Sequence, residues 1–203
     1  MITELVLESL AYNIGFNILG GNKNHSYKNE QTFDNLNLAN NMKLSWNNKT
    51  SKGFFFRAES FFNFTGYIES MAKESGKDIF NAYGGKSLLK QSHGESFLSL
   101  FQNKFTEGIF ILDEPEAALS AERQLSLMTI LSDLSKTGKC QFIIATHSPL
   151  LITIPNSEIY EIDNNCLIKK HYSETNQFNL YKNFINSPER YLKYLCTEDK
   201  DVF

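Results

Sequence analysis

Two adjacent acids follow the most apolar strand-like stretch of the chain. Residues 109–112 (IFIL) run directly into Asp113 and Glu114. In an open parallel sheet, ligands bind beyond the carboxyl ends of the strands, so these two acids stand at the edge where a ligand is expected. An aspartate at this place can hold a hydrated Mg²⁺ on nucleotide phosphates, and the next glutamate can polarise a water for attack on a phosphate. The alternative is a solvated acidic turn, which this motif alone supports equally well.

A second motif, QSHGES at residues 91–96, stands just ahead of a predicted helix. A serine and a glycine at a helix N-terminus offer a hydroxyl, backbone N–H groups and the positive end of the helix dipole, which together suit an anion. An ordinary N-cap by Ser92 or Ser96 is the simpler interpretation, and this motif alone favours it.

A third motif places His147 just beyond another apolar strand, residues 141–145 (QFIIA). A histidine at this sheet edge, beside Asp113, can hydrogen-bond a terminal phosphate or an attacking water. The alternative is a turn residue whose ring is satisfied locally.

The elements that must position these residues alternate between short apolar strands and helices, which predicts an α/β fold with a mainly parallel sheet flanked by helices. Its strands are expected at residues 53–57, 108–112 and 141–145, its helices at 4–14, 59–73, 95–103, 121–135 and 187–196, and an edge hairpin at 157–162 and 166–171. Leu125, Met128, Leu131 and Leu134 are the expected apolar side of the helix at 121–135.

An asparagine-rich segment, residues 20–52, reads as a loop or insertion within a single domain of residues 1–203. Interleaved lysines and an aromatic ring could form a nucleic-acid face there, but interspersed acids favour a solvated loop. The residues concerned are Lys23, Lys28, Lys43, Lys49 and Lys52 with Trp46. Arg57 and Glu59, at the end of the first strand, could approach a nucleotide, but a structural ion pair or an acid at the start of a helix is favoured.

Composition excludes several classes of protein. The 203 residues carry 20 Lys+Arg against 23 Asp+Glu, a net charge of −3, which gives no electrostatic footprint for nucleic acid. No apolar run approaches the ~20 residues that cross a bilayer, so no membrane partner is expected. Three widely spaced cysteines argue against a disulfide framework or a zinc cluster and favour a reducing cytoplasm.

Taken in order, the three motifs resemble the distal half of an ABC-type ATPase domain, a P-loop NTPase: signature motif, Walker B, D-loop and switch histidine. SHGES, LDEPEAALS and ATHSP are most similar to the small bacterial ATPases labelled AAA-family or ABC-like, relatives of SMC-type heads. GFFFRAESFF, YGGKSLLKQSHGESFL and SPERYLKYL also resemble that family, so the similarity runs from about Glu8 to Leu195.

This resemblance implies a role for each matching residue. Asp113 would be the Walker B acid on Mg²⁺, Glu114 the general base and His147 the switch histidine. Ser92, Gly94 and Glu95 would be signature residues that contact ATP held by a partner domain, so a nucleotide-sandwiched homodimer is implied. The D-loop would comprise Ala118, Leu119 and Ser120, with Ser120 where the family commonly carries aspartate.

The sequence contains no G-x-x-x-x-G-K-[ST] phosphate loop, whose amides and lysine an NTPase of this kind needs. Gly85-Lys86-Ser87 does not supply one, because Phe80 stands where the first glycine belongs. Residues 7–11 (LESLA) resemble the helix that follows the Walker A lysine. The resemblance therefore implies a chain that starts just after or within its own phosphate loop, is N-terminally incomplete and turns over little by itself.

We therefore expect the ATP-binding and ATP-hydrolysing part of a dimeric ABC-like ATPase. Two other hypotheses stay open: a non-catalytic interaction module that keeps the ATPase scaffold, and a nucleic-acid-associated subunit in repair or phage defence, which rests on family analogy alone.

Overall fold

A computed structural model describes residues 2–18, 20–21, 36–75 and 77–195 of the chain. The chain divides into two compact units, Met1–Thr146 and His147–Phe203, which are described separately below. Every predicted site residue except His147 belongs to the first unit.

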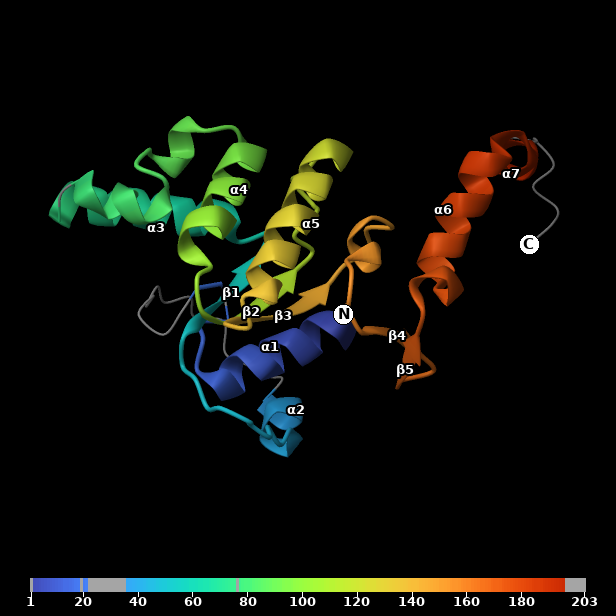
Figure 1. The fold of residues 1–203 in the computed structure, drawn as a ribbon, viewed down its shortest axis with the longest axis horizontal. Helices are drawn as coiled ribbons and strands as arrows, with labels where there is room; N and C mark the ends of the chain where they lie inside the picture. The colour runs from blue at the N-terminus through green and yellow to red at the C-terminus, as the bar shows by residue number, and fades with distance from the viewer. Residues whose placement is uncertain (1, 19, 22–35, 76, 196–203) are drawn as a thin grey trace. The chain divides into compact units, whose positions relative to one another are not determined.

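The first unit is built on a three-stranded parallel sheet in the order β1-β2-β3 (Figure 1). Its strands are β1 (Gly53–Arg57), β2 (Gly108–Asp113) and β3 (Cys140–Ala145). The last residues of the three strands are register partners, Arg57 beside Asp113 and Asp113 beside Ala145. The predicted α/β fold with a parallel sheet flanked by helices is confirmed, and its carboxyl edge carries the two acids.

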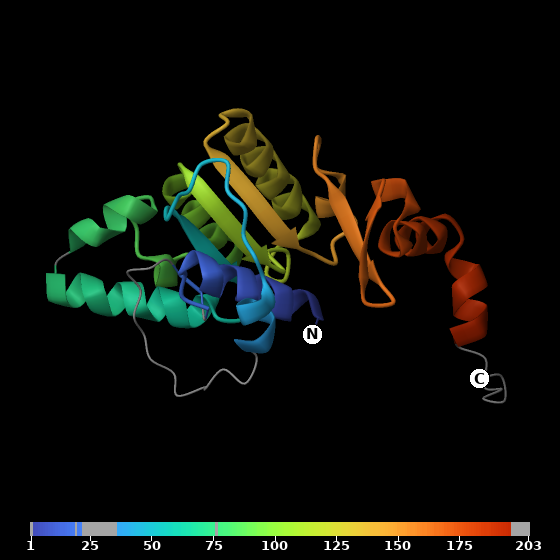
Figure 2. The ribbon, with the colours of Figure 1, turned by 90° about the horizontal axis from the view of Figure 1, so that it is seen from below.

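One face of the sheet is covered by α1 (Ile2–Ile14), as Figure 2 shows. The buried side of α1 packs on the odd-numbered residues of the strands, because successive strand residues point to opposite faces. This core comprises Leu7, Ala11, Ile14, Phe16, Phe55, Ile109, Ile111 and Ala145. Helix α1 ends at Gly15, which adopts φ +88° and donates its N–H to the Ala11 carbonyl at 3.0 Å.

The opposite face is filled by aromatic rings and covered by three helices, α3 (Phe61–Ser75), α4 (His93–Lys104) and α5 (Ala121–Lys136) (Figure 1). Phe56 of β1 meets Phe97 and Phe101 of α4 with ring centroids 4.9 and 5.1 Å apart. Phe110 of β2 stacks on Phe105 at 4.2 Å. Phenylalanines on both sides of β1 explain why the strand GFFFR is buried on both faces.

Helix α5 buries a different stripe from the predicted one. Leu127 and Leu131, one turn apart, are buried, whereas Leu125 is 51% exposed. Residues two positions apart point to widely separated sides of a helix, so Leu125 and Leu127 cannot share a face. The expectation for Leu125 was therefore wrong, whereas Leu131 is confirmed in the core.

The second unit contains an antiparallel pair, β4 (Ile159–Asp163) and β5 (Cys166–Lys170), followed by two helices, α6 (Asn176–Asn186) and α7 (Pro188–Leu195). The predicted hairpin is confirmed. Asn164 and Asn165 form its turn at φ +47° and +62°, the left-handed region that asparagine tolerates in two-residue hairpin turns. Helix α7 was predicted and α6 was not.

Shorter elements complete the described residues. They are the helix α2 (Leu36–Asn41) and the 3-10 turns η1 (Lys77–Tyr83), η2 (Leu88–Lys90), η3 (Leu151–Thr153) and η4 (Tyr172–Glu174). Much of the asparagine-rich segment, with Lys23 and Lys28, lies outside the described residues, as does Cys196. None of the helices in the described ranges is both long and apolar enough to cross a membrane.

Strand β1 can approach β2 closely at Gly53 because glycine has no side chain. This glycine has φ +139°, and a Cβ there would lie 1.8 Å from the Ile109 carbonyl oxygen.

We expect Gly53→Ala to lower the free energy of unfolding by about 2–4 kcal/mol, because it adds backbone strain to a steric clash. The matched control is Gly66→Ala in α3, where nothing lies within 4 Å of the new Cβ. That substitution should stabilise the helix by about 0.5–1 kcal/mol. Urea denaturation measures both, and equal effects would contradict the described β1–β2 packing.

Candidate functional site

Asp113 and Glu114 are fixed at the carboxyl edge of the sheet by backbone hydrogen bonds to both neighbouring strands. The Asp113 carbonyl accepts from Ala58 N–H at 3.3 Å, and Glu114 N–H donates to the Ala145 carbonyl at 3.0 Å. The Asp113 side chain is mostly buried, at 13% exposure, whereas Glu114 is exposed. The two acids therefore stand in different environments although they are adjacent in the sequence.

Glu114 holds an unusual backbone conformation. Its φ is +46°, in the left-handed region that costs a residue with a Cβ roughly 1–2 kcal/mol. The following turn is closed by hydrogen bonds from Ala117 N–H to the Glu114 carbonyl and from Leu119 N–H to the Glu116 carbonyl, at 3.0 and 2.8 Å. Strain of this kind is characteristic of functional positions, since the surrounding structure must maintain it.

Arg57, at the end of β1, is the buried centre of an acidic cluster. Its side chain is 7% exposed, and it donates to Glu8 and Glu4 at 2.5 Å each and to Glu59 at 2.6 Å. Its Nε lies 3.6 Å from Asp113 Oδ2. The structural ion pair favoured for Arg57 and Glu59 is therefore present, and it extends to α1 and to the candidate Walker B acid.

The pKa values of this cluster follow from burial and charge. Burial raises the pKa of Asp113 to about 6, an effect that Arg57 offsets in part and that nearby carboxylates reinforce. Burial lowers the pKa of Arg57, but the carboxylates of Glu59 and Glu8 outweigh it, so the net shift is upward. Arg57 therefore stays positively charged. The Asp113 carboxyl group ionises at a higher pH than an ordinary aspartate does.

The predicted signature turn is the N-terminus of α4, with Ser92 as N-cap. The Glu95 carboxylate accepts from the backbone N–H and the hydroxyl of Ser92 at 2.9 and 2.7 Å. These hydrogen bonds lower the pKa of Glu95. The simpler interpretation of the motif, an N-cap by Ser92, is thus confirmed, and the structure shows that this cap is a capping box with Glu95.

Arg123 of α5 is a neighbour of this turn that sequence reasoning missed. Its Nη1 donates to Ser92 Oγ at 3.3 Å, and its Nη2 lies 4.0 Å from the Glu95 carboxylate. The guanidinium occupies the space over Gly94, where a Cβ would come within 2.1 Å of Nη1. The basic residue three positions after Ser120 was the available signal, but nothing in the spacing linked it to a turn 31 residues upstream.

The predicted D-loop residues lie between β2 and α5. Leu119 is buried, and Ala118 is half-buried. Ser120 is the N-cap of α5 and accepts from Arg123 N–H at 3.4 Å. Through Arg123, the D-loop and the signature turn are therefore joined within the first unit.

His147 is the first residue of the second unit, two positions after β3 ends. It is exposed, and its carbonyl accepts from Gln177 Nε2 at 2.7 Å. The predicted strand before it, at residues 141–145, is confirmed as part of β3. Its place beside Asp113 and its role as a switch stay predictions.

Gly85-Lys86-Ser87 lies between the turns η1 and η2 and does not follow a strand. Gly84 and Gly85 both have positive φ, and Gly85 N–H donates to the Phe80 carbonyl at 2.8 Å. This segment is a tight turn, as expected from its place in the sequence.

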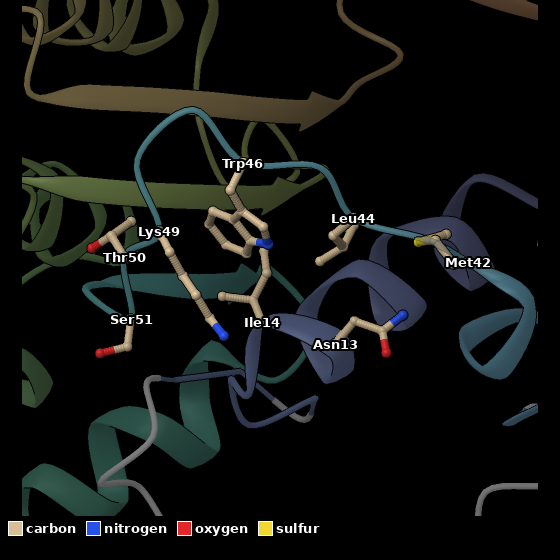
Figure 3. Close-up of a pocket in the computed structure, with 8 residues that line it drawn as sticks. All are labelled: Asn13, Ile14, Met42, Leu44, Trp46, Lys49, Thr50 and Ser51. Atoms are coloured by element: carbon tan, nitrogen blue, oxygen red, sulfur yellow. The ribbon is translucent and has the colours of Figure 1, made fainter.

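A pocket of about 400 Å³ opens at the other end of the sheet, between the last turn of α1 and the segment before β1 (Figure 3). Ile14, Leu44, Trp46 and Met42 form its apolar wall, and its polar residues are Asn13, Lys49, Thr50 and Ser51. It contains none of the predicted site residues, so the candidate site is the carboxyl edge and not this pocket.

Asp113 makes stability depend on pH. Its pKa in the fold, about 6, is above the ordinary value of 3.8, so the folded state holds this proton more tightly than the unfolded chain does. Its contribution to stability is therefore full at low pH and is lost as pH rises from about 4 through 6.

We expect Asp113→Asn to raise the free energy of unfolding at pH 8 by about 3 kcal/mol more than at pH 4. Denaturant titration at the two pH values measures the difference. The control is Asp133→Asn, an exposed acid paired with Lys136, which should change stability by less than ~1 kcal/mol at either pH. A pH-independent effect of Asp113→Asn would contradict the raised pKa.

The contact between Gly94 and Arg123 predicts an energetic coupling. Gly94→Ala should lower the free energy of unfolding by about 1 kcal/mol more in the unmodified chain than in an Arg123→Ala chain. The reason is that the Arg123 side chain occupies the space of the new Cβ. A double-mutant cycle of unfolding free energies measures this, and strictly additive effects would show that the guanidinium lies elsewhere.

Comparison with known proteins agrees with this geometry. Residues 24–153, more than half of the chain, match the family model described as "AAA domain, putative AbiEii toxin, Type IV TA system". Neither a curated protein nor a solved structure matches significantly. With its parallel α/β sheet, its strand ending in Asp113 and Glu114, and this family match, the chain belongs to the AAA family of nucleotide-binding, ATPase-like domains.

Proposed function

We propose that this chain provides the hydrolytic acids of an ATPase that works as a nucleotide-sandwiched dimer. The observation that carries the proposal is the pair Asp113–Glu114 at the carboxyl end of the central strand, with Glu114 in a left-handed backbone. An edge residue that keeps both a carboxylate and backbone strain is better explained by chemistry than by solvation of a turn.

Asp113 fits the cation that such an ATPase uses. In nucleotide sites Mg²⁺ is held by one or two carboxylates, substrate phosphates and waters, not by a cage of protein ligands. Asp113 offers one such carboxylate at the carboxyl end of β2. When bound, Mg·ATP supplies the bond that is cleaved and the charge that offsets the phosphates.

Glu114 is the residue we assign as general base. Its side chain is exposed at the sheet edge while its N–H is fixed to the Ala145 carbonyl, so its carboxylate can accept a proton from a water. Because the neighbouring Asp113 is buried and differently solvated, the two adjacent acids can serve different roles.

The signature turn is the part we assign to a partner's nucleotide. Ser92 and Glu95 are exposed at the N-terminus of a 12-residue helix, where the backbone N–H groups and the dipole favour an anion. Gly94 and Ser120 both lie against Arg123, so the signature turn and the start of α5 are neighbours. We assign the D-loop residues Ala118, Leu119 and Ser120 to the same interface from the resemblance. His147, in the second unit, is the switch residue that the resemblance implies.

The 203 residues contain no G-x-x-x-x-G-K-[ST], so they do not themselves supply the phosphate loop that the proposed reaction needs. The chain by itself should then bind ATP weakly and hydrolyse it at no meaningful rate.

A second candidate function is a non-catalytic interaction module with an ATPase scaffold. The absence of a phosphate-loop motif from the sequence favours it, since the acids would then have no triphosphate to act on. Both candidates predict dimerisation, and only the first predicts turnover that depends on Glu114.

The decisive variant is Glu114→Gln in a chain to which a phosphate-loop segment has been joined ahead of α1. Loss of the base should lower ATP turnover by about 10²–10⁴-fold and leave an ATP-bound dimer that size-exclusion chromatography with light scattering detects. Glu122→Gln, an exposed acid in the first turn of α5, is the matched control and should leave turnover unchanged. Turnover by Glu114→Gln at the unmodified rate would reject the catalytic proposal.

A further inference from the structure

The guanidinium of Arg57 is held by glutamates from two directions. Two of them lie one turn apart on α1, and the third follows β1, and each accepts a charge-assisted hydrogen bond of 2.5–2.6 Å. Hydrogen bonds of this kind are short and about twice as strong as neutral ones. We call these three residues the glutamate clamp: Glu4, Glu8 and Glu59.

The same arginine makes no hydrogen bond with Asp113. The two are register partners at the ends of neighbouring strands, so they are close enough for a bidentate arginine–carboxylate pair. Yet the nearest approach is 3.6 Å, from Arg57 Nε, and this Nε makes no hydrogen bond with any residue that the structure describes. Both Nη groups are turned to the glutamates instead.

Packing agrees with this division. The guanidinium carbon lies 5.9 Å from the centre of the Phe55 ring, which supports it on the α1 side of the sheet.

We propose that the glutamate clamp holds Arg57 away from Asp113 and so keeps the Asp113 carboxylate open to a divalent cation. Without the clamp, the guanidinium would close on Asp113 and compete with the cation for the same oxygens. This inference rests on the proposed function, in which Asp113 is the cation ligand. Glu4, Glu8 and Glu59 are therefore positioning residues, and two of them make the cation site depend on the first turns of α1.

The test is a titration of the 203-residue chain with Mn²⁺ alone, followed by paramagnetic broadening of backbone amide resonances at Leu112 and Glu114. Such broadening reports a cation near Asp113 without requiring ATP or turnover. Asp113→Asn should abolish it. Glu107→Gln, which removes an ion-paired acid at the amino end of β2, is the control that should leave it unchanged.

The clamp variant Glu8→Gln/Glu59→Gln should need about fivefold more Mn²⁺ for the same broadening, and a further Arg57→Met should restore the original response. The diagnostic quantity is the coupling: Arg57→Met should strengthen Mn²⁺ binding about fivefold more in the clamp variant than in the unmodified chain. Simple loss of negative charge predicts additive effects, because a distant charge acts equally in both backgrounds.

Each outcome decides a separate question. Broadening that is lost in Asp113→Asn but shows additive effects of the other substitutions overturns the clamp and leaves the proposed function intact. Absence of broadening near Asp113 in every variant overturns the clamp, whereas the proposed function, in which substrate phosphates also hold the cation, is decided separately by Glu114→Gln. If the double variant fails to fold by circular dichroism, Glu59→Gln alone serves, because that side chain is 73% exposed, and its coupling to Arg57→Met decides the matter in the same way.

Discussion

The central strand β2 can carry no polar side chain along its length, because it is paired on both edges and covered on both faces. Residues 108–112 are all buried, between the α1 core on one side and the rings of Phe105 and Phe142 on the other. Polar chemistry is possible only where this strand leaves the sheet. The positions of Asp113, Glu114 and the D-loop all follow from that single restriction, since each begins where the burial of β2 ends.

The charge balance at this edge is the second determinant of the structure. A buried guanidinium costs several kcal/mol to desolvate unless carboxylates surround it. Arg57 meets that requirement with acids from α1, from the segment after β1 and from β2, so one side chain joins three parts of the first unit. Ion pairs therefore stabilise this edge of the sheet. Its acids outnumber the single arginine, so a cationic ligand can be attracted there.

Strong local patterns made most of this structure predictable. The strands at 53–57, 108–112 and 141–145 are short apolar runs, and the hairpin turn at Asn164 and Asn165 has the residues that positive φ requires. Helix α6 was missed because asparagines interrupt its apolar pattern, although Thr175 is a regular cap at its N-terminus. The contacts of Arg57 with α1 and of Arg123 with Gly94 could not be predicted, because they join elements far apart in the chain through side chains whose partners only tertiary packing selects.

The backbone at Glu114 has a consequence for how the gene encoding this chain would change over time. Glycine or asparagine would adopt φ +46° at lower cost, so selection for stability alone would replace the glutamate at that position. In a lineage released from the need for a carboxylate, position 114 would be among the first at this edge to drift. We therefore expect related chains that use the carboxylate to keep glutamate at this position in spite of its backbone cost, and chains that carry glycine or asparagine there to lack its chemistry.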